Sequence, residues 1–187
     1  MNRLLIYLMI LTIISCNKEP LLQLREKPFI TYVIPAGSHY SSQSSYKSFQ
    51  DSVLKFTVRF DSSAIYTNVE ASNQGDINKL YGFGEEGSHH ENSARFGWNW
   101  ENRKLNLYAY CYVAGERHSI LMGEAVIGNE YNCTIRLSGD SYVFYFNNIT
   151  HSIPRTLHTK VATGYLLYPY FGGDETAPHE ITIHIRP

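Results

Sequence analysis

Apolar and polar residues alternate with a period of two in six short segments of this chain. In residues 54–60 and 95–100, for example, every second side chain is apolar and the residues between are polar or glycine. A period of two indicates a β-strand with one buried face, and no segment shows the period of an amphipathic helix of three turns. The other alternating segments are residues 105–113, 133–137, 142–146 and 181–185.

Residues that favour turns separate these segments. Gly115, Gly128-Asn129, Gly139-Asp140 and Asn147-Asn148 all fall between alternating stretches. Many short strands joined by such turns, without helices, are typical of a sandwich. We therefore predict an all-β fold, a single antiparallel β-sandwich or jelly roll that comprises residues 29–187.

The N-terminus has the composition of a signal peptide. Arg3 supplies a positive charge, and residues 4–14 form an apolar run that is too short to span a bilayer as a helix. Residues 13–16, Ile-Ile-Ser-Cys, resemble the lipobox of bacterial lipoproteins. The resemblance implies cleavage before Cys16 and attachment of lipid to this cysteine.

The predicted organisation is therefore a lipoprotein signal peptide at 1–15, a lipid-anchored tether at 16–28 and the sandwich domain. Asn17 follows the cysteine in place of aspartate, which by the same resemblance favours the outer membrane. We expect a protein of the bacterial cell envelope that is held on a membrane by its N-terminal lipid. The sequence leaves open which side of the membrane it faces.

Charge and composition restrict the partners. The formal net charge is −1, so there is no basic surface for nucleic acid and we expect no nucleic-acid partner. The chain contains 15 Tyr, 9 Phe and 2 Trp. Aromatic residues favour strands and also form binding surfaces, so they are expected both in the core and on a ligand face.

Two resemblances extend over the predicted domain. Residues 80–84, 93–98, 105–113 and 142–146 resemble the strand succession of concanavalin-A-like (laminin-G-like) sandwiches. Residues 76–80, 93–98 and 170–179 are similar to uncharacterised lipoproteins of Bacteroidetes. The first resemblance implies a fold that carries lectins, glycosidases and lyases alike, and the second implies no function.

The polar sides of the predicted strands form a candidate ligand surface. Sugar rings stack on aromatic side chains, and arginine pairs with carboxylates or sulfates through two hydrogen bonds. If the sheet curves, these side chains would line a groove, whereas the alternatives are packing against a second sheet or a solvated face. The candidate binding residues are Arg95, Asn99, Asn106, Tyr108, Tyr110, Tyr112, Arg136 and His184, and Lys55 and Arg59 share the same side.

Other motifs have weaker chemical signals. His89-His90-Glu91 is interpreted as a polar loop, because adjacent histidines point apart and no third histidine has metal-ligand spacing. Asp174 and Glu175 offer oxygen ligands to calcium, or they simply follow a tight glycine turn; no other cofactor is expected. Cys111 and Cys133 form a disulfide or remain buried thiols.

Three functions remain open. The leading hypothesis is a lipid-anchored protein that binds glycan without catalysis. The first alternative is a lyase acting on uronate polymers, in which an Arg or Asn of this surface would neutralise the substrate carboxylate and a Tyr or His would move protons. Arg95 and His184 are the residues whose loss is expected to abolish such activity. The second alternative is a structural or assembly lipoprotein that binds another envelope protein through its exposed aromatic residues.

Overall fold

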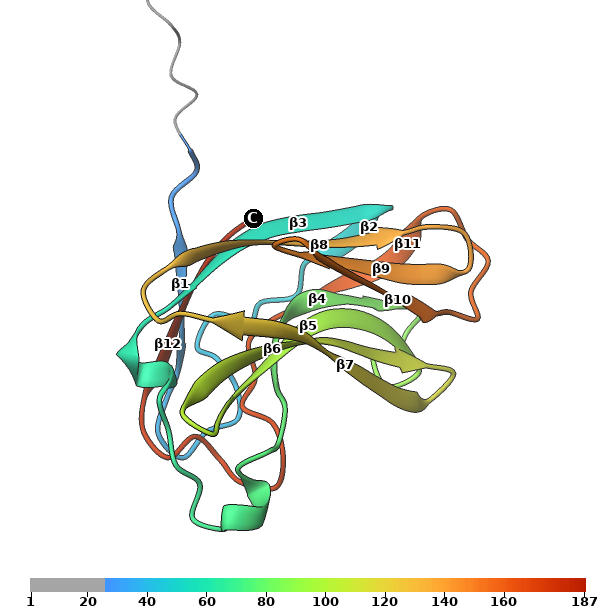
Figure 1. Ribbon diagram of the computed structural model, residues 1–187. Coiled ribbons are helices and arrows are strands. Elements are labelled where there is room, and N and C mark those ends of the chain that lie inside the picture. Colours follow the sequence, from blue (N-terminus) through green and yellow to red (C-terminus); the bar gives the residue numbers. More distant parts are fainter. Residues whose placement is uncertain (1–25) are drawn as a thin grey trace, which may run out of the picture.

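The computed structural model describes residues 26–187 and contains two six-stranded antiparallel sheets packed face to face (Figure 1). The first sheet has the order β1 (Ile30–Ile34), β12 (Ile181–Arg186), β3 (Val53–Phe60), β8 (Glu130–Leu137), β9 (Ser141–Phe146) and β10 (Ile149–Pro154). The second has the order β2 (Ser48–Asp51), β11 (Ala162–Leu167), β4 (Asn78–Glu85), β5 (Asn92–Glu101), β6 (Lys104–Val113) and β7 (Glu116–Ala125). The prediction of an all-β antiparallel sandwich is confirmed.

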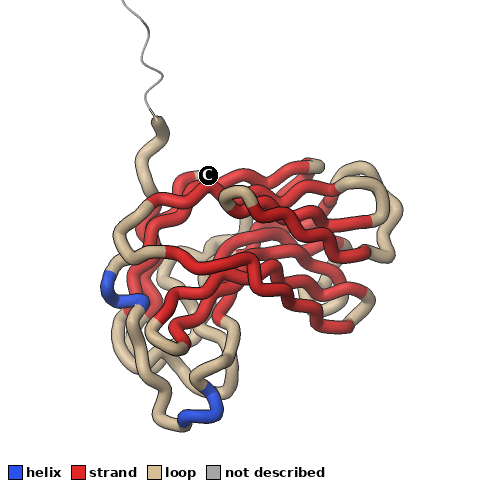
Figure 2. Tube along the Cα trace, viewed as in Figure 1, coloured by secondary structure: helices blue, strands red, loops and turns tan. Residues whose placement is uncertain are grey.

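Helix is confined to two single turns in this part of the chain, η1 (Ser62–Ala64) and η2 (Ala71–Asn73), in the loops at one end of the sandwich (Figure 2). Neither described helix is long and apolar enough to cross a membrane. The predicted signal peptide and lipidated Cys16 lie outside the described residues, so both stay predictions.

The core lies between the sheets and is rich in aromatic rings. Phe96 of β5 meets Phe56 and Phe144 of the opposite sheet edge to face, at centroid distances of 5.7 and 5.3 Å. Trp98, also on β5, lies 5.3 Å from Phe60. Each such pair contributes about 1 kcal/mol beyond the apolar area that it buries. These aromatic rings thus serve packing, as the alternation along β5 predicts.

Strand β6 turns its small apolar residues inward and its tyrosines outward. Leu107, Ala109 and Cys111 are fully buried in the core, whereas Tyr110 and Tyr112 belong to the outer face of the second sheet. Cys111 and Cys133 are both buried and free, and they belong to different sheets. Burial raises the pKa of both thiols.

A buried ionic cluster links the two sheets. Arg155, which follows β10, donates from Nη2 to Oε2 of Glu85 on β4 at 2.7 Å. The hydroxyl of Tyr142 on β9 donates to the other carboxylate oxygen at 2.6 Å. Burial without partners would cost each charge several kcal/mol, so the cluster holds the sheets and the segment after β10 in one arrangement.

Candidate functional site

The outer face of the second sheet carries side chains aligned across five strands. Arg117 of β7 is paired with Tyr112 of β6, which is paired with Ser93 of β5. Ser93 is paired with Gly84 of β4, and Gly84 with Tyr165 of β11. Because neighbouring strands are about 4.8 Å apart, this row places Arg117 and Tyr165 about 19 Å from each other along the sheet.

A second row lies two residues along each strand. Its members include Tyr110 of β6, Arg95 of β5 and Gly82 of β4. A Cβ on Gly82 would lie 2.3 Å from Cβ of Arg95, and one on Gly84 would lie 3.1 Å from Cβ of His89. The glycines of β4 therefore leave the space that Arg95 and His89 occupy above the sheet.

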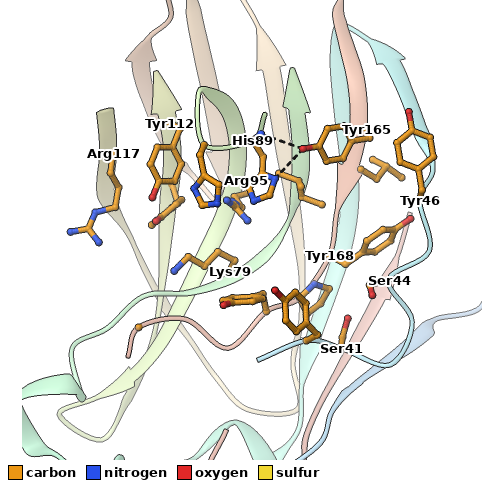
Figure 3. Close-up of a pocket in the computed structure, with 18 residues that line it drawn as sticks. Ser41, Ser44, Tyr46, Lys79, His89, Arg95, Tyr112, Arg117, Tyr165 and Tyr168 are labelled. Atoms are coloured by element: carbon orange, nitrogen blue, oxygen red, sulfur yellow. Dashed lines mark hydrogen bonds between the residues drawn. The ribbon is translucent and has the colours of Figure 1, made fainter. Parts of the chain in front are cut away.

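Three segments rise around these rows and enclose a cleft of about 620 Å³ (Figure 3). They are the chain between β1 and β2, the turn between β4 and β5, and the stretch after β11. We call this space the cleft. It is lined by Tyr40, Ser41, Ser44, Tyr46, Lys79, His89, His90, Arg95, Tyr110, Tyr112, Arg117, Tyr165, Leu166, Leu167, Tyr168, Pro169, Tyr170 and Gly173.

The cleft is cationic. Lys79, Arg95 and Arg117 line it, and no Asp or Glu of residues 26–187 does. Arg95 is only 6% exposed, forms none of the ion pairs within residues 26–187, and has no hydrogen-bond partner there for its Nε atom. Its guanidinium lies 5.5 Å from the ring centroid of Tyr110, and burial lowers its pKa. A buried guanidinium without a carboxylate is chemically suited to bind an anion.

Lys79 lies beside the same tyrosine. Its Nζ donates to the carbonyl oxygen of Ile77 at 2.9 Å and lies 5.1 Å from the ring centroid of Tyr110. Burial, together with the charges of Arg95 and Arg117, lowers the pKa of Lys79 to about 8. The ammonium is thus mostly protonated at neutral pH, and an anion in the cleft would stabilise it further.

His89 and Tyr165 form a hydrogen-bonded pair on the wall of the cleft. The hydroxyl of Tyr165 accepts from the backbone N–H of His89 at 3.2 Å and shares a second hydrogen bond with its Nδ1 atom at 3.0 Å (Figure 3). Burial, then the charges of Arg95 and His90, lowers the pKa of His89 to about 4. The imidazole is therefore neutral at pH 7, with a lone pair on one ring nitrogen.

Three candidates on the same face use their polar groups in hydrogen bonds within the protein. Asn99 is fully buried; its Nδ2 donates to the carbonyl oxygen of Gly75, and its Oδ1 accepts from Asn106 and from the hydroxyl of Tyr108. These three candidates form a chain of hydrogen bonds under the Gly75 turn and do not line the cleft. Of the eight candidate residues, Arg95, Tyr110 and Tyr112 line it.

Arg136 and His184 lie elsewhere, so the expectation that all candidates line one groove is wrong. They belong to β8 and β12 of the first sheet, where their neighbours Ile135 and Ile183 are buried against the second sheet. Their own side chains therefore point to the opposite surface of the sandwich, and Lys55 and Arg59 of β3 share that surface. His184 bonds to Thr31 through Nδ1 at 3.1 Å, far in the fold from Arg95.

The carboxylate of Glu175 ties down a loop. Its two oxygens accept hydrogen bonds from the backbone N–H groups of Val69 and Glu70 and from the side chain of Asn73, at 2.7 to 2.9 Å. These bonds lower the pKa of Glu175. Asp174 is exposed, and within residues 26–187 no group of three or more His, Cys, Asp or Glu side chains is arranged to hold a metal ion.

Most residues that line the cleft were not among the candidates, and the most important of these for its chemistry are Lys79, His89, Arg117 and Tyr165. His89 belongs to the segment interpreted as a polar loop, and Arg117 lies on β7, whose mostly exposed residues do not alternate clearly. Lys79 shows in the sequence only as part of the stretch 76–80. Nothing in the sequence joins these positions, because they come from four different strands or turns.

No protein-family model matches this chain, and no curated protein matches it in sequence. Solved structures do. Alginate lyase AlyC3 is similar with a TM-score of 0.60 and 8% identity, covering 84% of this chain and 72% of that chain. An alginate lyase from Alteromonas sp. 272 is similar with a TM-score of 0.52 and 10% identity, covering 91% of this chain and 88% of that one.

A third similar structure is a GH16 protein from a mixed linkage glucan PUL of Bacteroides ovatus, with a TM-score of 0.53, 8% identity, and coverage of 84% of this chain and 78% of that chain. The fold is a concanavalin-A-like jelly roll. At these identities the likeness extends to the fold alone. The similarity to lipoproteins of Bacteroidetes stays a prediction, since no family model matches.

Proposed function

We propose that the protein binds an acidic glycan in the cleft and is presented for this purpose on the bacterial envelope by a lipid on Cys16. The observation that carries the proposal is Arg95, a buried guanidinium without a carboxylate partner, flanked by Lys79 and Arg117. An uncompensated buried charge lowers stability, and an anionic ligand beside Arg95 would compensate it. The tyrosine rings around it offer the apolar faces on which sugars stack.

The pair His89 and Tyr165 favours a second candidate, a lyase acting on uronate polymers. In β-elimination a base removes the proton beside the carboxylate, the bond to the next sugar breaks, and an acid protonates the departing oxygen, which leaves a carbon–carbon double bond. Neutral His89 would be the base, Tyr165 the acid, and Arg95 the group that stabilises charge on the carboxylate. His89 takes the role that the sequence had suggested for His184. Alginate lyases among the fold neighbours support this candidate.

Two buried arginines provide a matched test. Arg95→Met removes an unpaired charge, so we expect the unfolding free energy to stay the same or rise by about 1 kcal/mol, while affinity for alginate or another polyuronate falls at least tenfold or so. Arg155→Met removes the partner of Glu85, so we expect a loss of roughly 3 kcal/mol or more. Denaturant unfolding and calorimetric titration measure both quantities. A destabilised Arg95→Met with unchanged affinity would contradict the proposal.

Catalysis is read from the near-ultraviolet absorption of unsaturated sugar ends during incubation with the same polymers. We expect Tyr165→Phe and His89→Ala to abolish this signal while polymer binding persists, and Arg136→Gln, on the opposite surface, to leave it unchanged. Binding without any unsaturated product from the wild-type protein would leave the glycan-binding function and remove the lyase. Absence of binding to any acidic glycan would favour the assembly role.

A further inference from the structure

The two ends of the cleft differ in chemistry. Figure 3 shows Arg117, Tyr112 and Lys79 toward one end and Tyr165, Tyr168 and Tyr46 toward the other. All three lining cations belong to β4, β5 and β7, whereas the lining residues contributed by β11 and the segment before β2 carry no charge. The charged end thus offers paired hydrogen bonds to an anion, and the other end offers rings and hydroxyl groups.

The charged end is concentrated on one tyrosine ring. Both the Lys79 ammonium and the Arg95 guanidinium lie within 5.5 Å of the Tyr110 centroid. These two cations repel each other, the charge of Asp76 offsets this only in part, and one carboxylate or sulfate between them would relieve the remaining repulsion. The geometry therefore fits one anionic sugar at this end.

The uncharged end has an exposed aromatic platform. Tyr46 is 78% exposed, and its ring lies 5.9 Å from that of Tyr165 with a tilt of 32°. Ser41 and Ser44 line the same end and add hydroxyl groups. An exposed large ring next to another, inside a cleft, offers a stacking surface to a neutral sugar. A second carboxylate would meet no cationic side chain of the lining there.

We propose that the ligand is an acidic polysaccharide in which charged sugars alternate with neutral sugars, with the charged unit over Arg95 and a neutral unit over Tyr46 and Tyr165. This proposal rests on the proposed function and specifies its substrate class. The row from Arg117 to Tyr165 spans about 19 Å at ordinary strand spacing, which accommodates more than one sugar ring. The charge asymmetry selects against polymers that carry a carboxylate on every sugar.

The test titrates the full-length protein with two kinds of acidic polymer and one neutral control. Hyaluronan and unsulfated chondroitin carry a carboxylate on alternate sugars, alginate and polygalacturonate carry one on every sugar, and cello-oligosaccharides carry none. We expect an alternating polymer to bind at least about tenfold more tightly than either homopolymer. Equal or tighter binding of the homopolymers would overturn the inference alone, whereas binding of no acidic polymer would overturn the proposed function too.

Two variants make the assignment of the ends specific. Tyr46→Ala is expected to weaken binding of the alternating polymers by about fivefold or more and to leave binding of the homopolymers nearly unchanged, because it removes only the stacking surface for the neutral sugar. Arg117→Gln is expected to weaken binding of all acidic polymers. Tyr145 is an exposed tyrosine of the first sheet, and Tyr145→Ala is the control that should change the binding of neither polymer class. An equal effect of Tyr46→Ala on both polymer classes, or no effect on either, would contradict the inference.

Discussion

Lys79 is the residue that makes anion binding in the cleft depend on pH. Its pKa of about 8 reflects burial and the neighbouring charges of Arg95 and Arg117. A bound anion favours the ammonium and raises this pKa, so the complex holds the proton to higher pH than the free protein does. The affinity for the anion is then highest below about pH 8 and falls as the pH rises above this value.

At this scale the prediction concerns the pH dependence of binding. Between about pH 7 and about pH 9, we expect the wild-type affinity for an acidic glycan to fall by up to roughly tenfold. Lys79→Met should bind more weakly at the lower pH and lose most of this dependence, because it removes the ammonium whose protonation changes over this range. Calorimetric titration at the two pH values measures the change. A Lys79→Met variant with the full wild-type dependence would assign the titration to another group.

At the scale of single elements, β4 couples the fold to the site through its glycines. Gly82 faces β5 so closely that a Cβ would lie 2.2 Å from the carbonyl oxygen of Ala94. Gly84 faces the turn before β5, with His89 at 3.1 Å and Tyr165 at 3.4 Å from such a Cβ. Substitution by alanine should therefore have different consequences at Gly82 and at Gly84.

Gly82→Ala must displace strand backbone, and we expect it to lower the unfolding free energy by about 2 kcal/mol or more. Gly84→Ala needs only a small shift of His89, and we expect a cost below about 1 kcal/mol but a clear loss of ligand affinity or lyase activity. Denaturant unfolding together with titration separates the two effects. Similar stability losses in both variants would mean that the turn carrying His89 is as rigid as β5.

For the molecule as a whole, the cluster of Glu85, Tyr142 and Arg155 fixes the position of the two sheets relative to each other. Each member is buried, and the ion pair bridges β4 and the segment after β10. Arg155 also donates to the carbonyl oxygen of Thr159, which orders the connection toward β11. This connection leads into the strand that contributes Tyr165 to the cleft.

A double-mutant cycle measures this coupling. We expect Glu85→Leu and Arg155→Met each to cost about 3 to 5 kcal/mol, because each leaves a buried charge unpaired. The double variant should cost clearly less than the sum, since it removes both charges together. Additive losses would show that the pair contributes packing rather than charge compensation.

Six of the eight inner strands of the sandwich could be predicted from the sequence, whereas the inner strands β4 and β11 and the four edge strands could not. Residues 54–60, 95–100 and 105–113 alternate strictly because one face of each is core, and they lie within β3, β5 and β6. The edge strands β1, β2, β7 and β10 were not predicted. Edge strands bury fewer residues, as the mostly exposed pattern of β7 illustrates, so burial leaves little alternation in them.

The sequence by itself determined the fold class, the inward face of most inner strands and the presence of a row of tyrosines with Arg95 on the opposite faces. Tertiary structure alone decided that Tyr110 and Tyr112 of β6 line a cleft and that Arg136 and His184 lie on the other surface. It also brought His89, Tyr165 and Lys79 to Arg95. The period of a strand records which side of it is buried, but it carries no information on which strands pair or which sheet they join. Those depend on contacts between residues far apart in the chain.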